Sequence, residues 1–413
     1  MGSKCYPCLD QKVVVLMKQL NRTHIPTLFT ILGSTFLFWN TALLAGQITI
    51  AWDANPDPTV GGYRIYYRQI GQSYSVVDVG NQTNFTLSDL KDGKAFCIAA
   101  TAYNVARTLE SGFSNEVCKQ LPPALQDMDG NGTADLAGVN DAGQIWYTLD
   151  RRTWTNIPGQ LSQLVAGDLN ADGRADLAGV NGAGQIWYTL DRRTWTNIPG
   201  TLTQLVAADL DGNGTADLAG VNDAGQIWYT LDRRTWTNIP GTLTQLVAAD
   251  LDGNGTADLA GLTGAGQIWY TLDRRTWTNI PGTLTQLVTA DLDGNGTADL
   301  AGLTSAGQIW YTLDRRTWTN IPGQLSQLVA GDLNADGRAD LAGVNGAGQI
   351  WYTLDRRTWT NISGWLNQIN IRDLNGDGRA DIVGLSVRSI YYTTNLSIWT
   401  NIPGQLTALD GNP

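Results

Sequence analysis

Residues 209–217 read Asp209-Leu-Asp-Gly-Asn-Gly-Thr-Ala-Asp217, and a nine-residue loop of the form D-x-[DN]-x-[DN]-G-x-A-D occurs seven times in the 413-residue chain. The spacing between copies is 41 residues throughout. The seven loops begin at Asp127, Asp168, Asp209, Asp250, Asp291, Asp332 and Asp373. Seven equal units without an insertion predict a closed or stacked array of one repeated structural unit.

Each repeat contains four candidate strands. In residues 163–198 they are QLVAGD, ADLAGVN, GQIWYTL and TWTNIPG, with turn residues such as Gly-Ala-Gly and Asp-Arg-Arg between them. Four short strands in about 40 residues match the size of one propeller blade. We therefore predict an all-β chain in which residues 121–413 form a seven-bladed β-propeller of 41-residue repeats, preceded by a small β-sandwich.

The two ends of the array indicate how it is completed. Residues 405–410 (QLTALD) are similar to the first strand of a further repeat, whereas residues 123–126 keep only a degraded version of that strand. We expect the last strand of the chain to complete the first blade. The alternative is an open solenoid, which would need polar capping repeats at both ends, and none is evident.

The acidic loop has the composition of a cation site. Alternate side chains at positions one, three, five and nine place oxygen ligands around one point, and oxygen ligands suit calcium. Gly214 occupies position six, where the chain must turn sharply. An EF-hand is excluded because Gly220 stands where its bidentate glutamate would be, and strands flank the loop. A metal-free turn is the alternative, but three converging carboxylates would then repel one another.

The predicted calcium ligands are the residues at these four positions of every loop. They are Asp127, Asp129, Asn131, Asp135, Asp168, Asn170, Asp172, Asp176, Asp209, Asp211, Asn213, Asp217, Asp250, Asp252, Asn254, Asp258, Asp291, Asp293, Asn295, Asp299, Asp332, Asn334, Asp336, Asp340, Asp373, Asn375, Asp377 and Asp381.

Two family resemblances overlap in the array. Residues 167–177, Gly-Asp-Leu-Asn-Ala-Asp-Gly-Arg-Ala-Asp-Leu, resemble the FG-GAP (or VCBS) repeats of integrin-type propellers, and that resemblance implies calcium at the four loop positions. The run Trp154-Thr-Asn-Ile-Pro-Gly-Gln-Leu161, followed by Gly179-Val-Asn181 and Gly184-Gln-Ile-Trp187, is similar to the tectonin repeats of propeller lectins. Tectonin repeats imply sugar binding, but they lack the calcium loop.

Aromatic and charged residues in the motif I-W-Y-T-L-D-R-R-T-W are candidate sugar ligands. Strand alternation sends Trp187 and Tyr188 to opposite faces of a blade, and carbohydrate sites combine an aromatic face with hydrogen-bonding groups. The alternative is that the tryptophans form core and the arginines are solvated. In the seventh repeat Tyr391 replaces the first Trp and Asn-Leu-Ser replaces Asp-Arg-Arg, which favours a functional role for the replaced residues. The candidates are Trp146, Trp187, Trp228, Trp269, Trp310, Trp351, Asp191, Arg192 and Arg193.

Residues 46–120 form a separate unit of strand-like segments between turn clusters, which is typical of a β-sandwich. The unit resembles a fibronectin type III domain in Trp52, Gly62-Tyr63, Tyr66, Leu87 with Leu90, the Ala-Thr-Ala-Tyr run ending at Tyr103, and the run Ser111-Gly-Phe-Ser-Asn-Glu116. Phe96 replaces the usual corner tyrosine. Cys97 and Cys118 fall on the last two strands, which form a hairpin, so we predict a disulfide between them; two buried free thiols are the alternative.

Residues 1–45 have the pattern of a targeting segment. An uncharged apolar stretch, residues 26–45, follows Lys18, Arg22 and His24, as in a secretory signal peptide, and Met17 is a candidate biological start. The alternative is an uncleaved membrane anchor, since about 20 apolar residues can span a bilayer. Either reading predicts a secreted, periplasmic or cell-surface protein, with membrane contact only through an uncleaved leader.

Charge and residue usage exclude several functions. The net charge is −11, and the array from residue 127 onward contains no Lys, Glu or His, so neither a nucleic-acid partner nor an enzyme with the usual nucleophiles and general bases is expected. Residues 142–198 are identical to 306–362, which repeats one surface around the array and suits weak multivalent binding. We expect a multivalent glycan-binding, lectin-like module. The alternative is an adhesion or scaffold protein with structural calcium and a protein partner.

Overall fold

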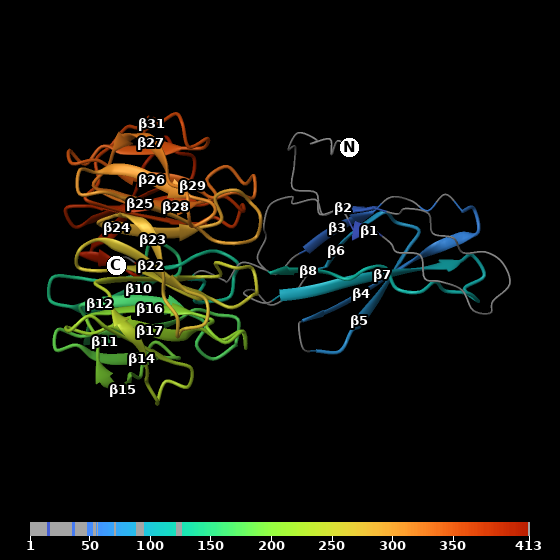
Figure 1. The fold of residues 1–413 in the computed structure, drawn as a ribbon, viewed down its shortest axis with the longest axis horizontal. Helices are drawn as coiled ribbons and strands as arrows, with labels where there is room; N and C mark the ends of the chain where they lie inside the picture. Colours follow the sequence, from blue (N-terminus) through green and yellow to red (C-terminus); the bar gives the residue numbers. More distant parts are fainter. Residues whose placement is uncertain are drawn as a thin grey trace. The chain divides into compact units, whose positions relative to one another are not determined.

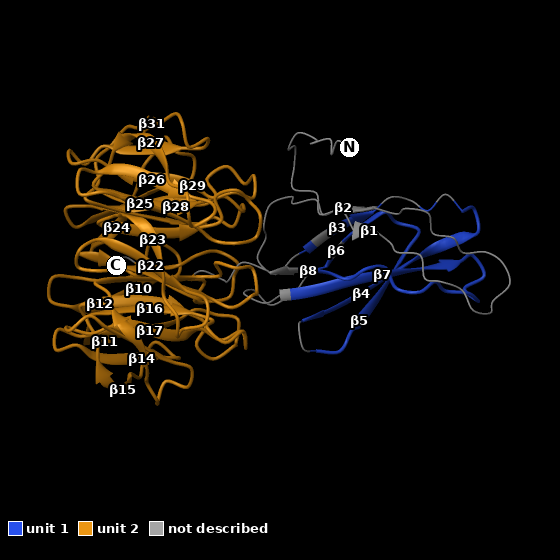
Figure 2. Cartoon of the chain, viewed as in Figure 1, with its two compact units in different colours: residues 1–123 blue, residues 124–413 orange. Residues whose placement is uncertain are grey.

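The computed structural model describes residues 15–16, 35–37, 48–52, 55, 57–69, 72–87, 95–120 and 126–411 (Figure 1). These residues form strands and turns and contain no helix, which confirms the all-β prediction. No helix in the described part is long and apolar enough to cross a membrane. The chain separates into two compact units, residues 1–123 and 124–413 (Figure 2).

The first unit consists of two four-stranded sheets around one core. One sheet has the order β1-β2-β3-β6 and the other β5-β4-β7-β8. Alternating apolar residues such as Ile48, Ile50 and Trp52 on β3 and Tyr63 and Ile65 on β4 bury their side chains in a shared cluster. The strands are β1 Val15–Leu16, β2 Thr35–Leu37, β3 Ile48–Trp52, β4 Val60–Gln69, β5 Ser75–Gly80, β6 Asn84–Leu87, β7 Ala95–Asn104 and β8 Val117–Gln120.

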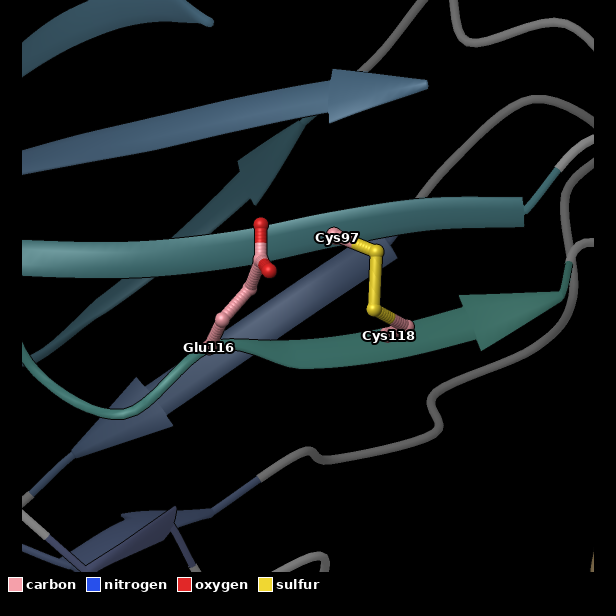
Figure 3. Close-up of side chains that lie close together, drawn as sticks. All are labelled: Cys97, Glu116 and Cys118. Atoms are coloured by element: carbon pink, nitrogen blue, oxygen red, sulfur yellow. A yellow bond between two sulfur atoms is a disulfide. The ribbon is translucent and has the colours of Figure 1, made fainter. Parts of the chain in front are cut away.

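The predicted targeting segment, residues 1–45, lies outside the described residues except for the backbone of β1 and β2. The signal-peptide and anchor hypotheses therefore both stay predictions. Within the described part, Cys97 on β7 pairs in register with Cys118 on β8, and their sulfurs are bonded as predicted (Figure 3). Glu116 lies beside them, but its carboxylate accepts hydrogen bonds from Arg68 and Tyr74.

The second unit consists of seven four-stranded antiparallel sheets, which follow one another along the chain. Each repeat forms the four strands that the sequence predicts. The first three sheets contain β9 Leu136–Val139, β10 Gln144–Thr148, β11 Thr155–Gln160 and β36 Ala408–Leu409; β12 Gln163–Gly167, β13 Asp176–Val180, β14 Gln185–Thr189 and β15 Thr196–Thr201; and β16 Gln204–Ala208, β17 Asp217–Val221, β18 Gln226–Thr230 and β19 Thr237–Thr242.

The remaining four sheets repeat this arrangement. They contain β20 Gln245–Ala249, β21 Asp258–Leu262, β22 Gln267–Thr271 and β23 Thr278–Thr283; β24 Gln286–Ala290, β25 Asp299–Leu303, β26 Gln308–Thr312 and β27 Thr319–Gln324; β28 Gln327–Gly331, β29 Asp340–Val344, β30 Ile350–Thr353 and β31 Thr360–Ile362; and β32 Gln368–Arg372, β33 Asp381–Ser386, β34 Ser389–Thr393 and β35 Thr400–Gln405.

Burial within a sheet depends on the position of the strand. The second strand of the second sheet, β13, is buried along its whole length, whereas the fourth, β15, buries only Ile198. A strand is buried on both faces only when other layers cover it on both sides. Apolar clusters supply that cover, because each contains side chains of two successive sheets, as in the cluster that joins Ile145 and Ile157 to Leu164 and Leu177.

The seventh sheet packs against the first. One apolar cluster combines Leu374 and Val383 of the seventh sheet with Ala134 and Leu136 at the start of the first. The last strand, β36, lies next to β9, with Ala408 opposite Val139. The two ends of the second unit therefore lie in the same sheet.

A buried ion pair lies at this junction. The Arg372 Nη2 atom is 2.8 Å from Oδ1 of Asp410, and both side chains are at most 1% exposed. The same guanidinium donates to the backbone carbonyls of Asp135, at 3.0 Å, and of Asp410, at 2.6 Å. No other repeat has this pair, since Gly or Ala stands at the Arg372 position in repeats two to six and Val at the Asp410 position.

Candidate metal loops and inter-sheet grooves

The first and ninth residues of each acidic loop organise its backbone. In the loop 209–217, Oδ1 of Asp209 accepts from the amide of Gly212 at 2.8 Å, and Oδ2 accepts from the amide of Gly214 at 2.7 Å. Oδ2 of Asp217 accepts from the amide of Leu210 at 3.0 Å. Gly214 has φ +80°, a conformation that favours glycine, as expected at the sixth position.

Four loops bring three carboxylates together. In the loops that begin at Asp127, Asp209, Asp250 and Asp291, one oxygen from each of the first, third and ninth residues lies within 4.8 Å of the others. These loops share the form D-x-D-G-N-G-T-A-D. Three of the four predicted ligand positions therefore converge in these four copies.

The ninth aspartate carries a buried oxygen that lacks a protein partner. Asp217 has no exposed surface, and its Oδ1 accepts no hydrogen bond; the same holds for Oδ1 of Asp135 and Asp258, which are 1% exposed. Burial, together with a smaller contribution from the other carboxylates of the loop, raises the pKa of each of these three carboxyls to about 7. A buried acceptor aimed among carboxylates fits a divalent cation, because the cation supplies the missing partner and removes the repulsion.

The other three loops have a different arrangement. In the loops that begin at Asp168, Asp332 and Asp373, asparagine stands at position three and aspartate at position five. The side-chain amide of Asn170 donates to Oδ2 of Asp172 at 3.2 Å, and the equivalent hydrogen bonds in the other two loops are 3.1 Å and 3.0 Å long. In these three loops the three carboxylates do not all come within 4.8 Å of one another, although burial again raises the pKa of the ninth aspartate to about 7.

Neighbouring loops are joined by backbone hydrogen bonds. The amide of Ala175, at position eight, donates to the carbonyl of Asp127 in the preceding loop at 2.7 Å, and the amide of Ala134 in the first loop donates to the carbonyl of Asp373 in the last at 2.8 Å. The remaining donors, in chain order, are Ala216, Ala257, Ala298, Ala339 and Ala380. The backbones of neighbouring loops are therefore in direct contact.

The predicted aromatic ligands lie between sheets. Trp187 packs against the cluster shared by the first and second sheets, whereas Tyr188 packs against the cluster shared by the second and third. The two side chains therefore point to opposite faces, as predicted. Trp187 is half-buried and so is Trp195, which lies in the same cluster.

A groove of about 200 Å³ opens between the fifth and sixth sheets. Its walls include the half-buried indoles of Trp351 and Trp359 and the side chains of Gln324 and Asn345. Gly323, with φ +136°, allows Trp359 to approach, because a Cβ there would be 3.2 Å from the indole nitrogen. The Gln324 side chain is exposed, and Asn345 uses one amide hydrogen to bond Gln349.

Gln324 and Asn345 were not among the residues that the sequence singled out. The signal was present as variation within the repeat, because the position of Gln324 holds Gln, Thr or Trp and that of Asn345 holds Asn, Thr or Ser. Two other junctions have both amides together with both tryptophans. They contain Gln160, Asn181, Trp187 and Trp195 between the first and second sheets, and Gln405, Asn140, Trp146 and Trp154 between the seventh and first.

The predicted Asp-Arg-Arg ligands have different environments. Oδ1 of Asp191 accepts from the amides of Arg193 and Thr194, and these bonds lower the pKa of the carboxyl. Arg192 donates to the carbonyl of Met128 at 2.9 Å and lies 5.6 Å from the ring centre of Tyr147, both in the neighbouring repeat. These contacts show that Asp191 and Arg192 build the turn and the inter-sheet contact, and their ligand role stays a prediction. Only Arg193 is left with a free, exposed side chain.

A family model described as the tectonin domain matches the chain over residues 99–254, 170–293 and 210–373, overlapping segments that together span residues 99–373. This match confirms the tectonin resemblance, whereas the FG-GAP (or VCBS) and fibronectin type III resemblances stay predictions. No curated protein matches the chain.

Several solved structures are similar to parts of the chain. The crystal structure of BBS1N in complex with ARL6DN, soaked with mercury, shares 13% identity at a TM-score of 0.48 and matches 67% of this chain and 88% of that chain. A structure titled myokine structure shares 18% identity over 21% of this chain and 92% of its own, at a TM-score of 0.19. The twitchin kinase region of C. elegans shares 15% identity over 33% of this chain and 30% of its own, at a TM-score of 0.18.

Proposed function

We propose that this chain, which belongs to the tectonin domain family, is an exported carbohydrate-binding protein whose seven sheets form a closed, calcium-stabilised propeller with several sugar sites. The tectonin domain is a β-propeller domain of lectin type, and this supports the assignment to carbohydrate binding. The first unit would be a fibronectin type III-like spacer. The propeller has no His, Cys, Lys or Glu, so we propose no catalytic activity.

Closure of the ring is supported by the junction between its ends. The seventh and first sheets share an apolar cluster, and β36 is the fourth strand of the first sheet. The backbone hydrogen bond from Ala134 to Asp373 is equivalent to the bond that joins each of the other pairs of neighbouring loops. The junction between the ends therefore has the apolar cluster and the loop-to-loop hydrogen bond of the other junctions, which is the arrangement expected of a ring rather than of an open solenoid.

Calcium is supported by the chemistry of the loops. The ligands would be the oxygen atoms at positions one, three, five and nine, and the buried, unpartnered Oδ1 atoms of Asp135, Asp217 and Asp258 are the strongest indication. A bound Ca²⁺ would supply the positive charge that these carboxylates lack. The four loops with three converging carboxylates would bind more tightly than the three in which an asparagine amide bonds the fifth residue.

The groove between the fifth and sixth sheets carries the sugar-binding proposal. Two indoles supply an apolar wall for the C–H face of a sugar ring, and the exposed amide of Gln324 can bond hydroxyl groups. The groove is smaller than the ~300–1,000 Å³ typical of sites for drug-sized ligands, so we expect it to hold one saccharide unit weakly. We expect a groove at each of the two other junctions that have the same four residues. Three grooves in one chain would gain affinity by avidity on a branched or repeated glycan.

A protein-binding scaffold is the second candidate. It is favoured by the packing of Trp351 and Trp359 into the core cluster of their junction, since tryptophans that stabilise sheets need no ligand. In that case calcium would stabilise the ring and the grooves would bind no sugar.

Substitutions that fill the grooves distinguish the carbohydrate-binding function from the scaffold function. Trp365 occupies the position of Gln324 in the sixth repeat, where the fourth strand ends at Ile362 and the indole lies against Gly348. The triple variant Gln160→Trp, Gln324→Trp, Gln405→Trp should lose binding on a glycan array while its melting temperature stays within a few degrees of the wild type. The control variant Thr201→Trp, Thr242→Trp, Thr283→Trp adds the same bulk to grooves without both amides and should retain binding. Equal binding by both variants, or no glycan signal from the folded wild type, would favour the scaffold.

A further inference from the structure

We propose that the end of the propeller that carries the acidic loops is a second binding surface, which takes an anionic polysaccharide when calcium is bound. The surface consists of the second arginine of each Asp-Arg-Arg turn, hereafter the arginine rim: Arg152, Arg193, Arg234, Arg275, Arg316 and Arg357. The proposal rests on the calcium loops and the carbohydrate class proposed above, and it uses a different site from the grooves.

The two arginine side chains of each turn have different environments. The first arginine contacts the neighbouring repeat: Arg274 donates to the carbonyl of Leu210 at 2.5 Å, and its guanidinium lies 5.6 Å from the ring centre of Tyr229. The second, Arg275, is exposed, and only its backbone amide is bonded. Within residues 126–411 none of the six rim guanidinium groups has a hydrogen bond or ion pair.

The seventh repeat shows that the fold does not need the rim arginine. There the Asp-Arg-Arg turn is replaced by Asn395-Leu-Ser397. Leu396 takes the place of the first arginine and packs into the apolar cluster of the sixth and seventh sheets, so that position keeps a structural role. Ser397 is exposed at the rim position. Six repeats therefore present a charged group that packing does not explain.

Strand register places the rim beside the acidic loops. Leu136, which follows the first loop, pairs with Thr148, which precedes the turn that contains Arg152. Val344 pairs with Ile350 at the opposite end of the sixth sheet, where Asn345 borders the groove. The arginine rim and the polar border of the grooves are therefore at different ends of the sheets, although Trp359 of the groove wall follows Arg357 by two residues.

Calcium would reverse the charge of this end. The loops and the Asp-Arg-Arg turns together hold 27 aspartates and 15 arginines, which leaves 12 excess negative charges. Seven divalent cations bring 14 positive charges and leave an excess of two positive charges. An anionic polymer would be repelled from the metal-free end and attracted to the loaded one.

The ligand class follows from the chemistry of the rim. A guanidinium group donates in a planar fork that matches carboxylate and sulfate groups, and one such group in each of six repeats fits a polymer with an anion in every few units. The exposed groups of the rim are guanidinium groups, and Trp187 and Trp351 of the same motif pack between sheets, so the rim itself offers no aromatic platform for nucleic-acid bases. A polysaccharide with uronate or sulfate groups is the ligand that agrees with both the charge and the family.

The test is binding of the full chain to immobilised heparin and hyaluronate, with dextran as the neutral control, in calcium and in EDTA. In calcium we expect binding to both anionic polymers that weakens at least tenfold between 50 and 200 mM salt, on the order expected for several ionic contacts. Replacement of all six rim arginines by serine, as at Ser397, should remove it. Replacement by lysine should keep a weaker, salt-dependent part, because the charge stays and the fork is lost.

Several results would overturn the proposal. They are binding of equal strength by the wild type and the six-serine variant, binding of equal strength in EDTA, binding to dextran, or tighter binding to double-stranded DNA than to heparin. The groove-filled variant described above should still bind heparin. Loss of array binding in that variant with heparin binding intact supports both proposals, and a negative array with heparin binding intact contradicts only the groove proposal.

Discussion

The buried pair Arg372–Asp410 allows closure of the ring to be tested by a change of two side chains. Replacing Asp410 with valine, the residue at this position in repeats two to six, leaves the guanidinium of Arg372 without its counter-ion at 1% exposure. Breaking a buried ion pair in this way costs about 3–5 kcal/mol of unfolding free energy. We therefore expect Asp410→Val to destabilise the propeller by that amount.

The double variant Arg372→Ala, Asp410→Val should recover most of the loss. It recreates the apolar pair found elsewhere in the array, and replacing both charges of a buried pair is commonly neutral. The wild-type pair is also incompletely bonded, because Nε of Arg372 and Oδ2 of Asp410 have no partner. Within a double-mutant cycle we expect a coupling energy of about 2–4 kcal/mol.

The assay is urea unfolding in calcium, followed by tryptophan fluorescence, which reports the propeller because it holds most of the tryptophans. The four proteins of the cycle should unfold with the same denaturant dependence if closure is retained. A cost below about 1 kcal/mol for Asp410→Val, or a double variant as unstable as the sum of the single changes, would refute the reasoning. Either result would mean that the two ends do not meet as described.

Three further predictions concern single features of the chain. The raised pKa of about 7 at Asp135, Asp217 and Asp258 means that these carboxyls bind protons more tightly in the folded state than in the unfolded state, so the melting temperature in EDTA should fall as pH rises from 4 to 8. Calcium addition at pH 7 should release protons, which calorimetry in two buffers measures. A melting temperature that does not change with pH would contradict this prediction. Gly323→Ala should cost about 1–3 kcal/mol, since φ is +136° and the Cβ would press on Trp359, whereas Gly346→Ala, with open space around it, should change the unfolding free energy by less than about 0.5 kcal/mol. Removing the disulfide in the double variant Cys97→Ser, Cys118→Ser should lower the unfolding free energy of the first unit by about 3 kcal/mol for a sequence separation of 21, and an unchanged transition in reducing buffer would contradict a structural role.

The fold was predictable because the same strand and loop pattern occurs seven times in the sequence. The 41-residue spacing, the strand pattern and the resemblance of residues 405–410 to a first strand anticipate the four-stranded sheets and the place of β36. The position of the ion pair at the junction was not predictable, because a lone Arg372 and a lone Asp410 look like surface charges until the ends are placed together.

The candidate site was predictable only in part. The residue types of the acidic loops predict a cation site. The difference between the four loops with converging carboxylates and the other three depends on a side-chain hydrogen bond such as that from Asn170 to Asp172. Arg192 and Arg193 are adjacent and identical in type, yet the first has φ +55° and turns into the neighbouring sheet, whereas the second faces solvent. Sequence spacing does not distinguish two such residues, and only packing between sheets separates the structural arginine from the free one.

The central proposal is that the calcium-stabilised propeller binds glycans through the grooves between its sheets. A glycan array probed with the full chain, in calcium and in EDTA, tests it most directly. We predict a set of bound glycans in calcium that disappears both in EDTA and in the variant with Trp at 160, 324 and 405. A folded, calcium-loaded chain that binds no glycan at any surface density would contradict the account.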